Sequence, residues 1–262
     1  MNSLIRNKEI LITKSKTESE KSVRPLIDAG AKLIYFPTIK IVPIFNSPEL
    51  KEIRENLHDF DFLIFTSVNS AKIFIDFIRQ YNLDLSKLKI ASIGSATFEY
   101  CNEMGIQVDI LPDNYSAKGL LTKFSSFNLS DNNILIPCSS LSRDELSRGL
   151  TELGAKVKLI PIYEVVKNYK EELYEEINSL KKRKPDVFLF TSPSSFENYL
   201  SIVGVEQILD YFEGSVIAAL GTTTENAIHD FNLTVNIVPQ IFTIEGASEA
   251  IIRYFNITAN LA

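Results

Sequence analysis

Short apolar runs alternate with amphipathic segments along most of the chain. The runs are continuous rather than alternately polar and apolar, which is typical of strands in a parallel sheet that helices cover on both faces. We expect strands at 9–13, 32–36, 62–65, 90–93, 108–111, 134–137, 157–160, 187–190, 216–220 and 235–238. Helical spacing of apolar residues predicts helices at 18–29, 70–79, 96–104, 143–153, 171–180, 195–202 and 223–231. The pattern therefore predicts an α/β protein with doubly wound parallel sheets.

The sequence also repeats itself after about 125 residues. Gly30-Ala31-Lys32 recurs as Gly154-Ala155-Lys156, and Phe65-Thr66-Ser67 recurs as Phe190-Thr191-Ser192. A third block keeps its internal spacing in both copies, as Gly94, Pro112, Ser116 and Gly119 and again as Gly221, Pro239, Thr243 and Gly246. Because the period is far longer than one solenoid turn, it indicates duplication of a domain-sized unit. We expect two similar lobes with a ligand cleft between them.

Composition and charge narrow the function. Lys and Arg number 27 against 33 Asp and Glu, and the net charge of -6 argues against a nucleic-acid partner. The basic run 181–184 follows a predicted helix, where cations favour the C-terminus. No apolar run approaches the roughly 18 residues of a membrane helix, and residues 1–14 do not resemble a signal peptide. We therefore expect a cytoplasmic protein that does not bind a membrane.

Several familiar catalytic motifs are missing from the sequence. It contains no phosphate-binding Gly-x-x-x-x-Gly-Lys-Ser/Thr, no Gly-x-Gly-x-x-Gly, no Gly-x-Ser-x-Gly and no Cys/His pair at metal spacing. Cys101 and Cys138 occupy unrelated places in the two copies and are expected to be buried free thiols. His58 and His229 are expected at the surface or near a helix end. We expect neither a metal nor a cofactor.

Hydroxyl side chains gather where the predicted strands end. Residues 66–69 (Thr-Ser-Val-Asn) and 191–195 (Thr-Ser-Pro-Ser-Ser) follow two strands, and 94–97 (Gly-Ser-Ala-Thr) and 221–224 (Gly-Thr-Thr-Thr) follow two others. Ligands of open α/β sheets bind beyond the carboxyl ends of the strands. Backbone NH groups at a helix N-terminus bind anions without a cation. The turns therefore predict a site for carboxylates, with the alternative that Ser and Thr only cap the helices.

These landmarks occur in the same order in one known family. They are Thr13-Lys14, Gly30-Ala31 with Pro37, Phe65-Thr66-Ser67, Gly94 with Thr97, Arg143 in Ser-Arg-Asp-Glu-Leu, Gly154-Ala155 with Pro161-Ile162-Tyr163, Phe190-Thr191-Ser192, and Gly221 with Thr224. Over roughly residues 8–253 the chain resembles uroporphyrinogen-III synthases. Each motif alone is weak, and the specificity of the resemblance comes from their order and spacing.

The resemblance implies that the lobes are not simply the two halves of the chain. One lobe would comprise 1–38 and 167–262, and the other 43–162. Two linker strands, at about 38–43 and 162–166, would join them, with the cleft between the lobes. The internal repeat by itself does not show this interleaving.

The resemblance also implies a reaction. Enzymes of this family cyclise the linear tetrapyrrole hydroxymethylbilane and invert its last ring through a spiro intermediate, giving uroporphyrinogen III and water in haem biosynthesis. Such a lyase needs no cofactor, and its eight-carboxylate substrate suits turns rich in hydroxyl and NH donors. We expect a monomer that makes at most transient contact with the enzyme that forms the bilane.

The family pattern assigns roles to individual residues. Tyr163 would be the catalytic group, hydrogen-bonding the departing hydroxyl as a weak acid, because a phenol ordinarily stays protonated at neutral pH. The alternative is that Tyr163 only packs in its strand. The expected substrate-binding residues are Thr66, Ser67, Asn69, Thr97, Arg143, Ser192, Ser195, Thr223 and Thr224. Lys14 stands where the family has arginine, and because it lacks the bidentate fork, a direct substrate contact there is in doubt.

Two functions of other classes remain open on the sequence. One is a non-catalytic two-lobe binder that closes around its ligand. The other is a cytoplasmic sensor descended from the enzyme, which would be expected to lose the hydroxyl turns and Tyr163 first. This chain retains both.

Overall fold

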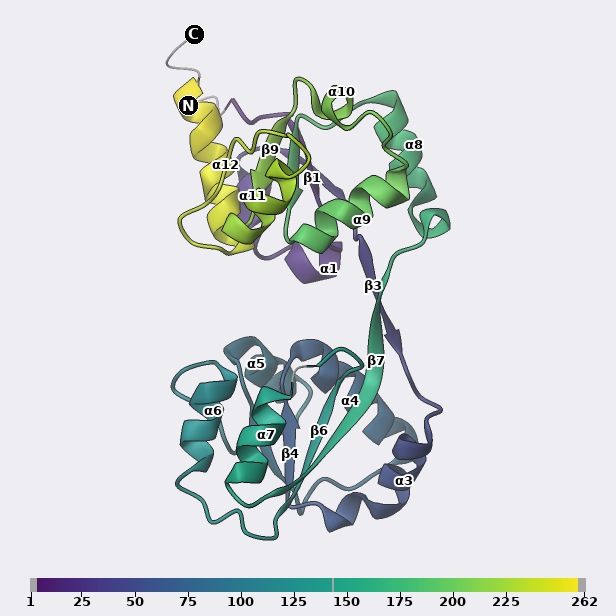
Figure 1. The fold of residues 1–262 in the computed structure, drawn as a ribbon, viewed down its shortest axis with the longest axis vertical. Helices are drawn as coiled ribbons and strands as arrows, with labels where there is room; N and C mark the ends of the chain where they lie inside the picture. The colour runs from purple at the N-terminus through teal and green to yellow at the C-terminus, as the bar shows by residue number, and fades with distance from the viewer. Residues whose placement is uncertain (1–3, 143, 259–262) are drawn as a thin grey trace. The chain divides into compact units, whose positions relative to one another are not determined.

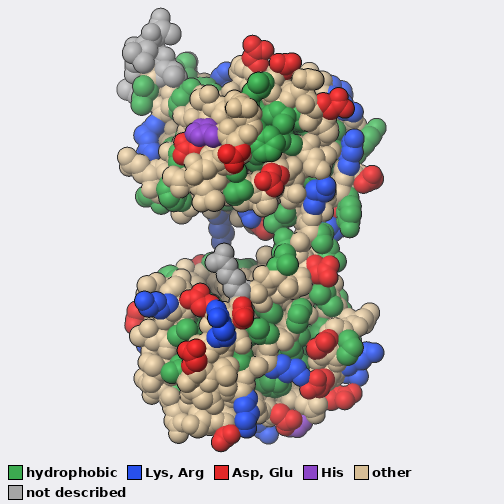
Figure 2. Space-filling model, viewed as in Figure 1, with side chains coloured by type: hydrophobic (Ala, Val, Ile, Leu, Met, Phe, Trp, Pro, Cys, Tyr) green, Lys and Arg blue, Asp and Glu red, His purple; other side chains and the backbone are tan. Residues whose placement is uncertain are grey.

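The computed structural model describes residues 4–142 and 144–258, with the side chain of residue 258 excluded. The chain forms two compact units (Figure 1). Unit 1 contains the described residues up to Lys40 together with those from Val166 onward, and unit 2 is Ile41–Val165. Lys and Arg side chains are interspersed with Asp and Glu on the face shown in Figure 2. No helix in the described ranges has both the length and the apolar composition needed to cross a membrane.

Unit 1 is built on a four-stranded sheet with the strand order β2-β1-β8-β9. Every neighbouring pair of these strands is parallel. The strands are β1 (Glu9–Ile12), β2 (Lys32–Tyr35), β8 (Val187–Phe190) and β9 (Val216–Ala219). The helices are α1 (Lys16–Ser19), α2 (Arg24–Asp28), η2 (Lys170–Leu173), α8 (Tyr174–Lys182), α9 (Pro193–Val203), α10 (Ile208–Phe212), α11 (Thr222–His229) and α12 (Ile244–Thr258).

Unit 2 contains most of a five-stranded sheet with the order β3-β7-β6-β4-β5. The last four strands are mutually parallel. The strands are β3 (Ile39–Pro43), β4 (Phe62–Phe65), β5 (Lys89–Ser92), β6 (Asn133–Ser139) and β7 (Lys156–Lys167). The helices are α3 (Pro48–Asn56), η1 (Leu57–Asp59), α4 (Val68–Tyr81), α5 (Ser95–Glu103), α6 (Ala117–Phe124) and α7 (Glu145–Glu152). The boundary between the units falls inside β3 and β7.

The two sheets share one strand order but draw on both copies of the sequence repeat. In the repeat, β1, β2, β4 and β5 of the first copy correspond to β6, β7, β8 and β9 of the second. The order β2-β1-β8-β9 therefore matches β7-β6-β4-β5 strand for strand. Each sheet joins the first two strands of one copy to the last two of the other. The repeat units have exchanged halves.

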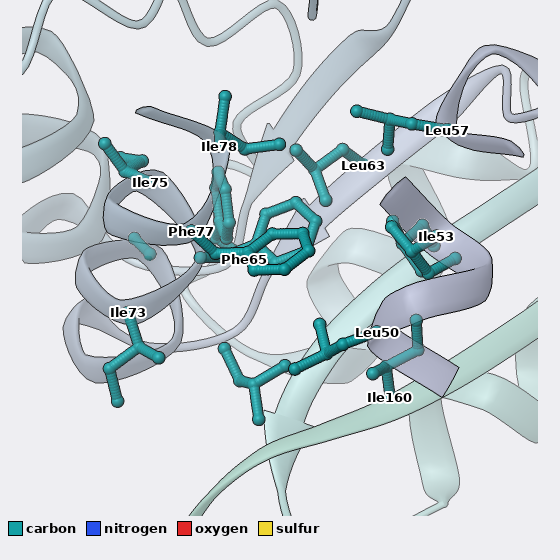
Figure 3. Packing of buried hydrophobic residues seen from close by; sticks show 14 of the residues in the cluster. Leu50, Ile53, Leu57, Leu63, Phe65, Ile73, Ile75, Phe77, Ile78 and Ile160 are labelled. Carbon is teal, nitrogen blue, oxygen red and sulfur yellow. The ribbon is translucent and has the colours of Figure 1, made fainter. Parts of the chain in front are cut away.

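Burial on both faces explains why the strands are continuous apolar runs. In β4, Leu63 and Phe65 belong to one buried cluster, which Figure 3 shows packed around Phe65 and Phe77, whereas Phe62 and Ile64 belong to another. The strand β8 alternates in the same way between two clusters of unit 1. A fully buried side chain of this size contributes about 1.5–3 kcal/mol. Every position of such a strand is therefore a core position, and the prediction of an α/β fold with parallel sheets is confirmed.

Two of the predicted strands were wrong. The segments 108–111 and 235–238 form only single parallel bridges, Ile110 to Ala91 and Ile237 to Ala218. Beside each bridge, a side-chain oxygen accepts a hydrogen bond from a backbone NH of the neighbouring strand, in place of a backbone carbonyl. The carboxylate of Asp109 accepts from the Ile90 NH at 2.8 Å, and the carboxamide oxygen of Asn236 accepts from the Ile217 NH at 2.8 Å. The apolar pattern did not reveal this substitution.

The helix predicted over 18–29 was also wrong, because it is broken into α1 and α2. Pro25 lies in the first turn of α2, where its missing NH is tolerated; inside one continuous helix it would remove a hydrogen bond. Within the described residues, four α-helices were not predicted, namely α3, α6, α10 and α12. The apolar segment 208–212 is short and α3 is mostly polar, so neither shows a clear helical repeat of apolar residues.

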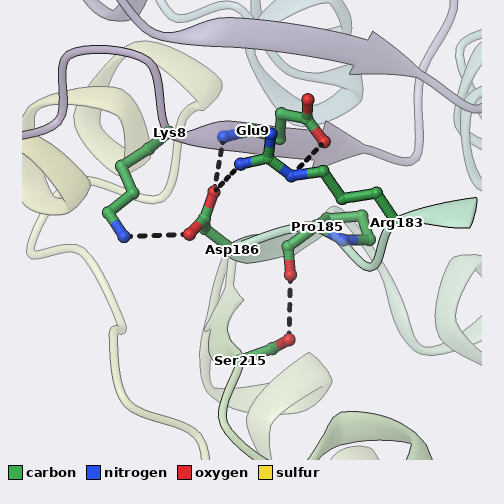
Figure 4. Close-up of polar contacts among 6 residues, drawn as sticks. All are labelled: Lys8, Glu9, Arg183, Pro185, Asp186 and Ser215. Carbon is green, nitrogen blue, oxygen red and sulfur yellow. Dashed lines mark hydrogen bonds and ion pairs between the residues drawn. The ribbon is translucent and has the colours of Figure 1, made fainter.

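Charged residues fix the amino ends of the strands (Figure 4). Asp186, just before β8, accepts a hydrogen bond from the Glu9 NH at 2.9 Å and pairs with Lys8 at 2.9 Å. Arg183, from the basic run 181–184, pairs with Glu9 at 3.4 Å and with Asp186 at 3.7 Å. In unit 2 the equivalent Asp61 accepts from the NH of Asn133 at 2.8 Å. The basic run thus has a structural role beside β1 and β8.

Candidate functional site

The turn after β4 is a reciprocal capping box. Ser67 is the N-cap of α4, and its Oγ accepts a hydrogen bond from the Ser70 NH at 3.1 Å. In return, the Ser67 NH donates to Oγ of Ser70 at 3.2 Å. The local sequence Ser-Val-Asn-Ser suffices to form this turn, because Ser at both ends satisfies orphan NH groups of the first helical turn. Thr66 and Asn69 on the same turn are half-buried.

Tyr163 in β7 reaches the same turn. Its side chain is 7% exposed within the cluster around Phe65, and its hydroxyl oxygen lies 3.4 Å from Oγ of Ser67. Its backbone oxygen accepts from the Ser140 NH at 3.0 Å, so the strand is held beside the loop that follows β6. The ring packs in the core while the phenol meets a turn hydroxyl.

The turn after β8 repeats this geometry in unit 1. Ser192 is the N-cap of α9 and accepts from the Ser195 NH at 3.1 Å, while Oγ of Ser195 accepts from the Ser192 NH at 2.9 Å. Oγ of Ser195 also accepts from the Thr191 NH at 3.1 Å. The hydroxyl of Thr13, from the end of β1, lies 3.4 Å from that of Thr191. Lys14 follows Thr13 and is half-buried.

The glycine turns differ from the serine turns. Gly94 and Gly221 are the N-caps of α5 and α11, and neither helix has a side-chain cap. Because glycine supplies no side-chain oxygen, NH groups at the start of these helices are left for an acceptor from outside the protein. The Thr224 NH is not one of them, since it donates to the Gly221 oxygen at 3.0 Å. Thr97 and Thr224 are each 4% exposed, whereas Thr223 is exposed. At the start of α11 the donors that a ligand can reach are therefore backbone NH groups and the hydroxyls of Thr222 and Thr223.

The structure brings the predicted residues into two groups, one in each unit. In unit 2, Thr66, Ser67 and Asn69 lie on one turn, which the Tyr163 hydroxyl reaches from β7. The Ile93 NH, which donates to the Phe65 oxygen at 3.2 Å, places the turn before Thr97 beside it. In unit 1 the group consists of Lys14, Ser192, Ser195, Thr223 and Thr224, at the ends of β1, β8 and β9. Arg143 lies outside the described residues.

The sequence analysis missed two parts of these groups. One is Thr13, whose hydroxyl contacts Thr191 and also donates to the Leu189 oxygen at 3.3 Å. The other is the loop after β6, where Ser140 is exposed and Ser142 donates its NH to the Ser139 oxygen at 3.1 Å. The signal was present, because the chain reads Cys-Ser-Ser-Leu-Ser where an apolar strand ends.

The two cysteines are buried free thiols, as the sequence predicted. Burial raises the pKa of Cys101 to about 11 and also raises the pKa of Cys138. In both cases the thiolate is disfavoured, so neither is poised as a nucleophile. His58 and His229 are exposed. Across residues 4–142 and 144–258, no three His, Cys, Asp or Glu side chains come close enough to hold a metal ion.

Comparison with known proteins identifies the family. The family model described as uroporphyrinogen-III synthase HemD matches residues 20–249, which include both serine turns, both glycine turns and Tyr163. The chain belongs to the uroporphyrinogen-III synthase family. The resemblance drawn from the sequence landmarks is therefore confirmed, and the ligand-binder and sensor alternatives are not favoured.

Relatives of this family are similar over nearly their full length. A uroporphyrinogen-III synthase of Chlorobaculum parvum is 27% identical, covering 93% of this chain and 98% of its own. A putative uroporphyrinogen-III synthase of Methanothermobacter thermautotrophicus is 26% identical, covering 89% and 93%. The crystal structure of the Helicobacter pylori enzyme aligns with a TM-score of 0.59 at 17% identity over 97% of this chain and all of that one. A mutant Thermus thermophilus uroporphyrinogen-III synthase gives 0.56 at 14% identity, covering 95% and 99%. These structures share the fold.

Proposed function

We propose that this protein is a uroporphyrinogen-III synthase that cyclises hydroxymethylbilane, inverts its last pyrrole ring and releases water. The observation that carries the proposal is the family match over 20–249, a segment that holds both serine turns, both glycine turns and Tyr163. The activity is that of a cyclising lyase in haem and porphyrin biosynthesis. Its chemistry draws only on hydroxyl and NH groups of the chain.

Carboxylate binding is the first task of such a site. The uncapped starts of α5 and α11 present backbone NH groups and the positive ends of helix dipoles. These donors bind carboxylates without carrying a charge. The protein can therefore hold an eight-carboxylate substrate although its own net charge is -6. Thr66, Ser67, Asn69, Ser192 and Thr223 add hydroxyl and amide donors beside them. The buried side chains of Thr97, Thr224 and Ser195 support the turns from within.

In this proposal, Tyr163 assists departure of the terminal hydroxyl. Its phenol gives a proton to the leaving oxygen, which departs as water. The pyrrole NH of the same ring loses a proton, which restores the phenol, and the ring is left as an electrophilic azafulvene. The substituted carbon of the last ring attacks this centre to give the spiro intermediate, which then rearranges to the inverted product. Oγ of Ser67, 3.4 Å from the phenol oxygen, orients the donor.

Control of conformation is the larger task, because the bilane also closes unaided to the uninverted isomer. Binding energy from the carboxylates is therefore best used to hold the rings where spiro attack is faster than direct closure. The hydrogen bonds that form each serine turn come from the same chain. We propose that the enzyme works as a cytoplasmic monomer. Size-exclusion chromatography with light scattering tests the monomer directly.

The decisive experiment is an isomer assay. Purified protein is mixed with freshly generated hydroxymethylbilane, and the oxidised products are separated chromatographically beside a no-enzyme control. Isomer III should predominate without added metal or cofactor. If the protein yields the same isomer I as the control, the proposed function is wrong.

A further inference from the structure

The third sequence block of the repeat builds the same loop in both units. In unit 1, the Thr243 NH donates to the Ile241 oxygen at 2.7 Å, and Oγ1 of Thr243 accepts from the Gly246 NH at 3.0 Å. In unit 2, the Ser116 NH donates to the Asn114 oxygen at 2.7 Å, and Oγ of Ser116 accepts from the Gly119 NH at 3.0 Å. The loops that precede α12 and α6 are therefore held by matching hydrogen bonds.

Glycine is required in each loop for close approach of the backbone. A Cβ on Gly246 would lie 2.3 Å from the Ile241 oxygen, and one on Gly119 would lie 2.0 Å from the Asn114 oxygen. Neither separation is compatible with a side chain. The fixed spacing from Ser or Thr to Gly therefore reflects one loop conformation that occurs in both units.

Each loop presents an aromatic side chain immediately before its capping hydroxyl. Phe242 precedes Thr243, Tyr115 precedes Ser116, and each ring is 56% exposed. A single exposed aromatic residue is unremarkable on a protein surface. Two lie here at equivalent positions, on loops held by the same hydrogen bonds, and the contacts of each ring determine its use.

The surroundings of Phe242 indicate that use. A Cβ on Gly221 would lie 3.4 Å from Cγ of Phe242, so the ring packs directly against the N-cap residue of α11. That helix start has no side-chain cap, and the adjacent Thr222 and Thr223 are exposed. An apolar ring face and a set of anion-binding donors therefore lie side by side at the end of β9.

We propose that Phe242 binds the apolar part of the substrate, a pyrrole ring face, while a carboxylate of the same ring binds the start of α11. Tyr115 does not have the corresponding contact, because no atom lies within 4 Å of a Cβ on Gly94, the N-cap residue of α5. This inference rests on the proposed function. A tetrapyrrole is the ligand class that fits, because short acetate and propionate chains keep each carboxylate close to a flat apolar ring. Aromatic rings favour offset or edge-to-face contact with such a ring.

The test compares Phe242→Ala, Phe242→Leu and Leu209→Ala in the isomer assay, with KM and kcat for hydroxymethylbilane. Leu209 is a matched control, since it is 55% exposed on α10 of the same unit and follows α9, away from the strand carboxyl ends. We expect Phe242→Ala to raise KM about tenfold with little change in kcat, Phe242→Leu to raise it less, and Leu209→Ala to leave it unchanged.

The outcomes separate the inference from the function on which it rests. If wild-type protein forms isomer III and the KM of Phe242→Ala stays within about twofold of the Leu209→Ala value, the inference is wrong and the function stands. If wild-type protein forms only isomer I, both fail. Circular dichroism melting of every variant identifies a KM effect that comes from unfolding, and in that case the milder Phe242→Leu decides by its KM.

Discussion

The hydroxyl oxygen of Tyr163 lies 3.4 Å from Oγ of Ser67, although the residues are 96 positions apart in the chain. They meet because β7 and β4 flank β6 in one parallel sheet, so their carboxyl ends lie at the same edge. Ser67 is at the same time the N-cap of α4. One hydroxyl thus links the proposed acid to a turn that is fixed by its own hydrogen bonds.

Replacing Tyr163 with phenylalanine removes the phenol and keeps the ring in the core. We expect kcat for isomer III to fall about 100-fold, because general acid assistance contributes roughly that much or more, with a loss of stability of at most about 1 kcal/mol. Single-turnover kinetics and urea unfolding measure the two effects. Tyr81→Phe, at the far end of α4, is the matched control and should leave kcat unchanged. A Tyr163→Phe enzyme with wild-type kcat would show that this tyrosine only packs.

Ser195→Ala should destabilise unit 1 by about 2 kcal/mol. The Ser195 hydroxyl is buried, accepts from the NH groups of Thr191 and Ser192, and donates to the Ser192 oxygen at 2.7 Å. Alanine leaves both NH groups without that acceptor. Urea unfolding measures the change, and Ser194→Ala, at the exposed neighbouring position, is the control. Equal midpoints for the two variants would contradict the capping role.

Gly246→Ala should cost about 1–3 kcal/mol, because the new Cβ would overlap the Ile241 carbonyl and force the loop before α12 to move. Gly94→Ala is the matched control for stability. At Gly94 a Cβ meets no atom within 4 Å, and the backbone φ of -127° is open to any residue. Thermal melting of both variants checks the difference, and a Gly246→Ala melting temperature equal to that of Gly94→Ala would refute the close-approach argument.

Asp186→Asn should lower stability at neutral pH and much less in acid. Burial alone raises the pKa of Asp186, but hydrogen bonds from Lys8 and the Glu9 NH and the charges of Lys8 and Arg183 outweigh it, and the pKa lies below its ordinary value of 3.8. Because the folded-state pKa is the lower one, the carboxylate stabilises the fold above about pH 4, and this contribution is lost as the pH falls through the folded-state pKa.

Urea midpoints of wild type and Asp186→Asn, measured from pH 7 down to pH 3, test this expectation. The two curves should converge as the pH drops. Asp210→Asn, at an exposed position on α10, should run parallel to wild type throughout. A gap between wild type and Asp186→Asn that stays constant with pH would mean that the pKa of Asp186 is the same in both states.

Much of the candidate site followed from local sequence. The patterns Ser67 to Ser70 and Ser192 to Ser195 form capping boxes through bonds within four residues, so a reader of the sequence can place them. The contact of Thr13 with Thr191 could not be found that way, because it joins the ends of β1 and β8 across 178 positions. The contact of the Phe242 ring with Gly221 could not be predicted either, because it depends on the conformation of the loop before α12.

The sequence by itself determined the repeat and most of the strands. Continuous apolar runs such as 62–65 and 187–190 become strands with those same bounds, since every position is buried on one face or the other. Which strand pairs with which was decided only by the tertiary structure. Backbone hydrogen bonds carry no sequence information, and β4 and β8 are nearly interchangeable apolar runs, yet β8 pairs with β1 and β4 with β6. The exchange of halves between the repeats arises from the packing of whole sheets and helices, and no single segment specifies it.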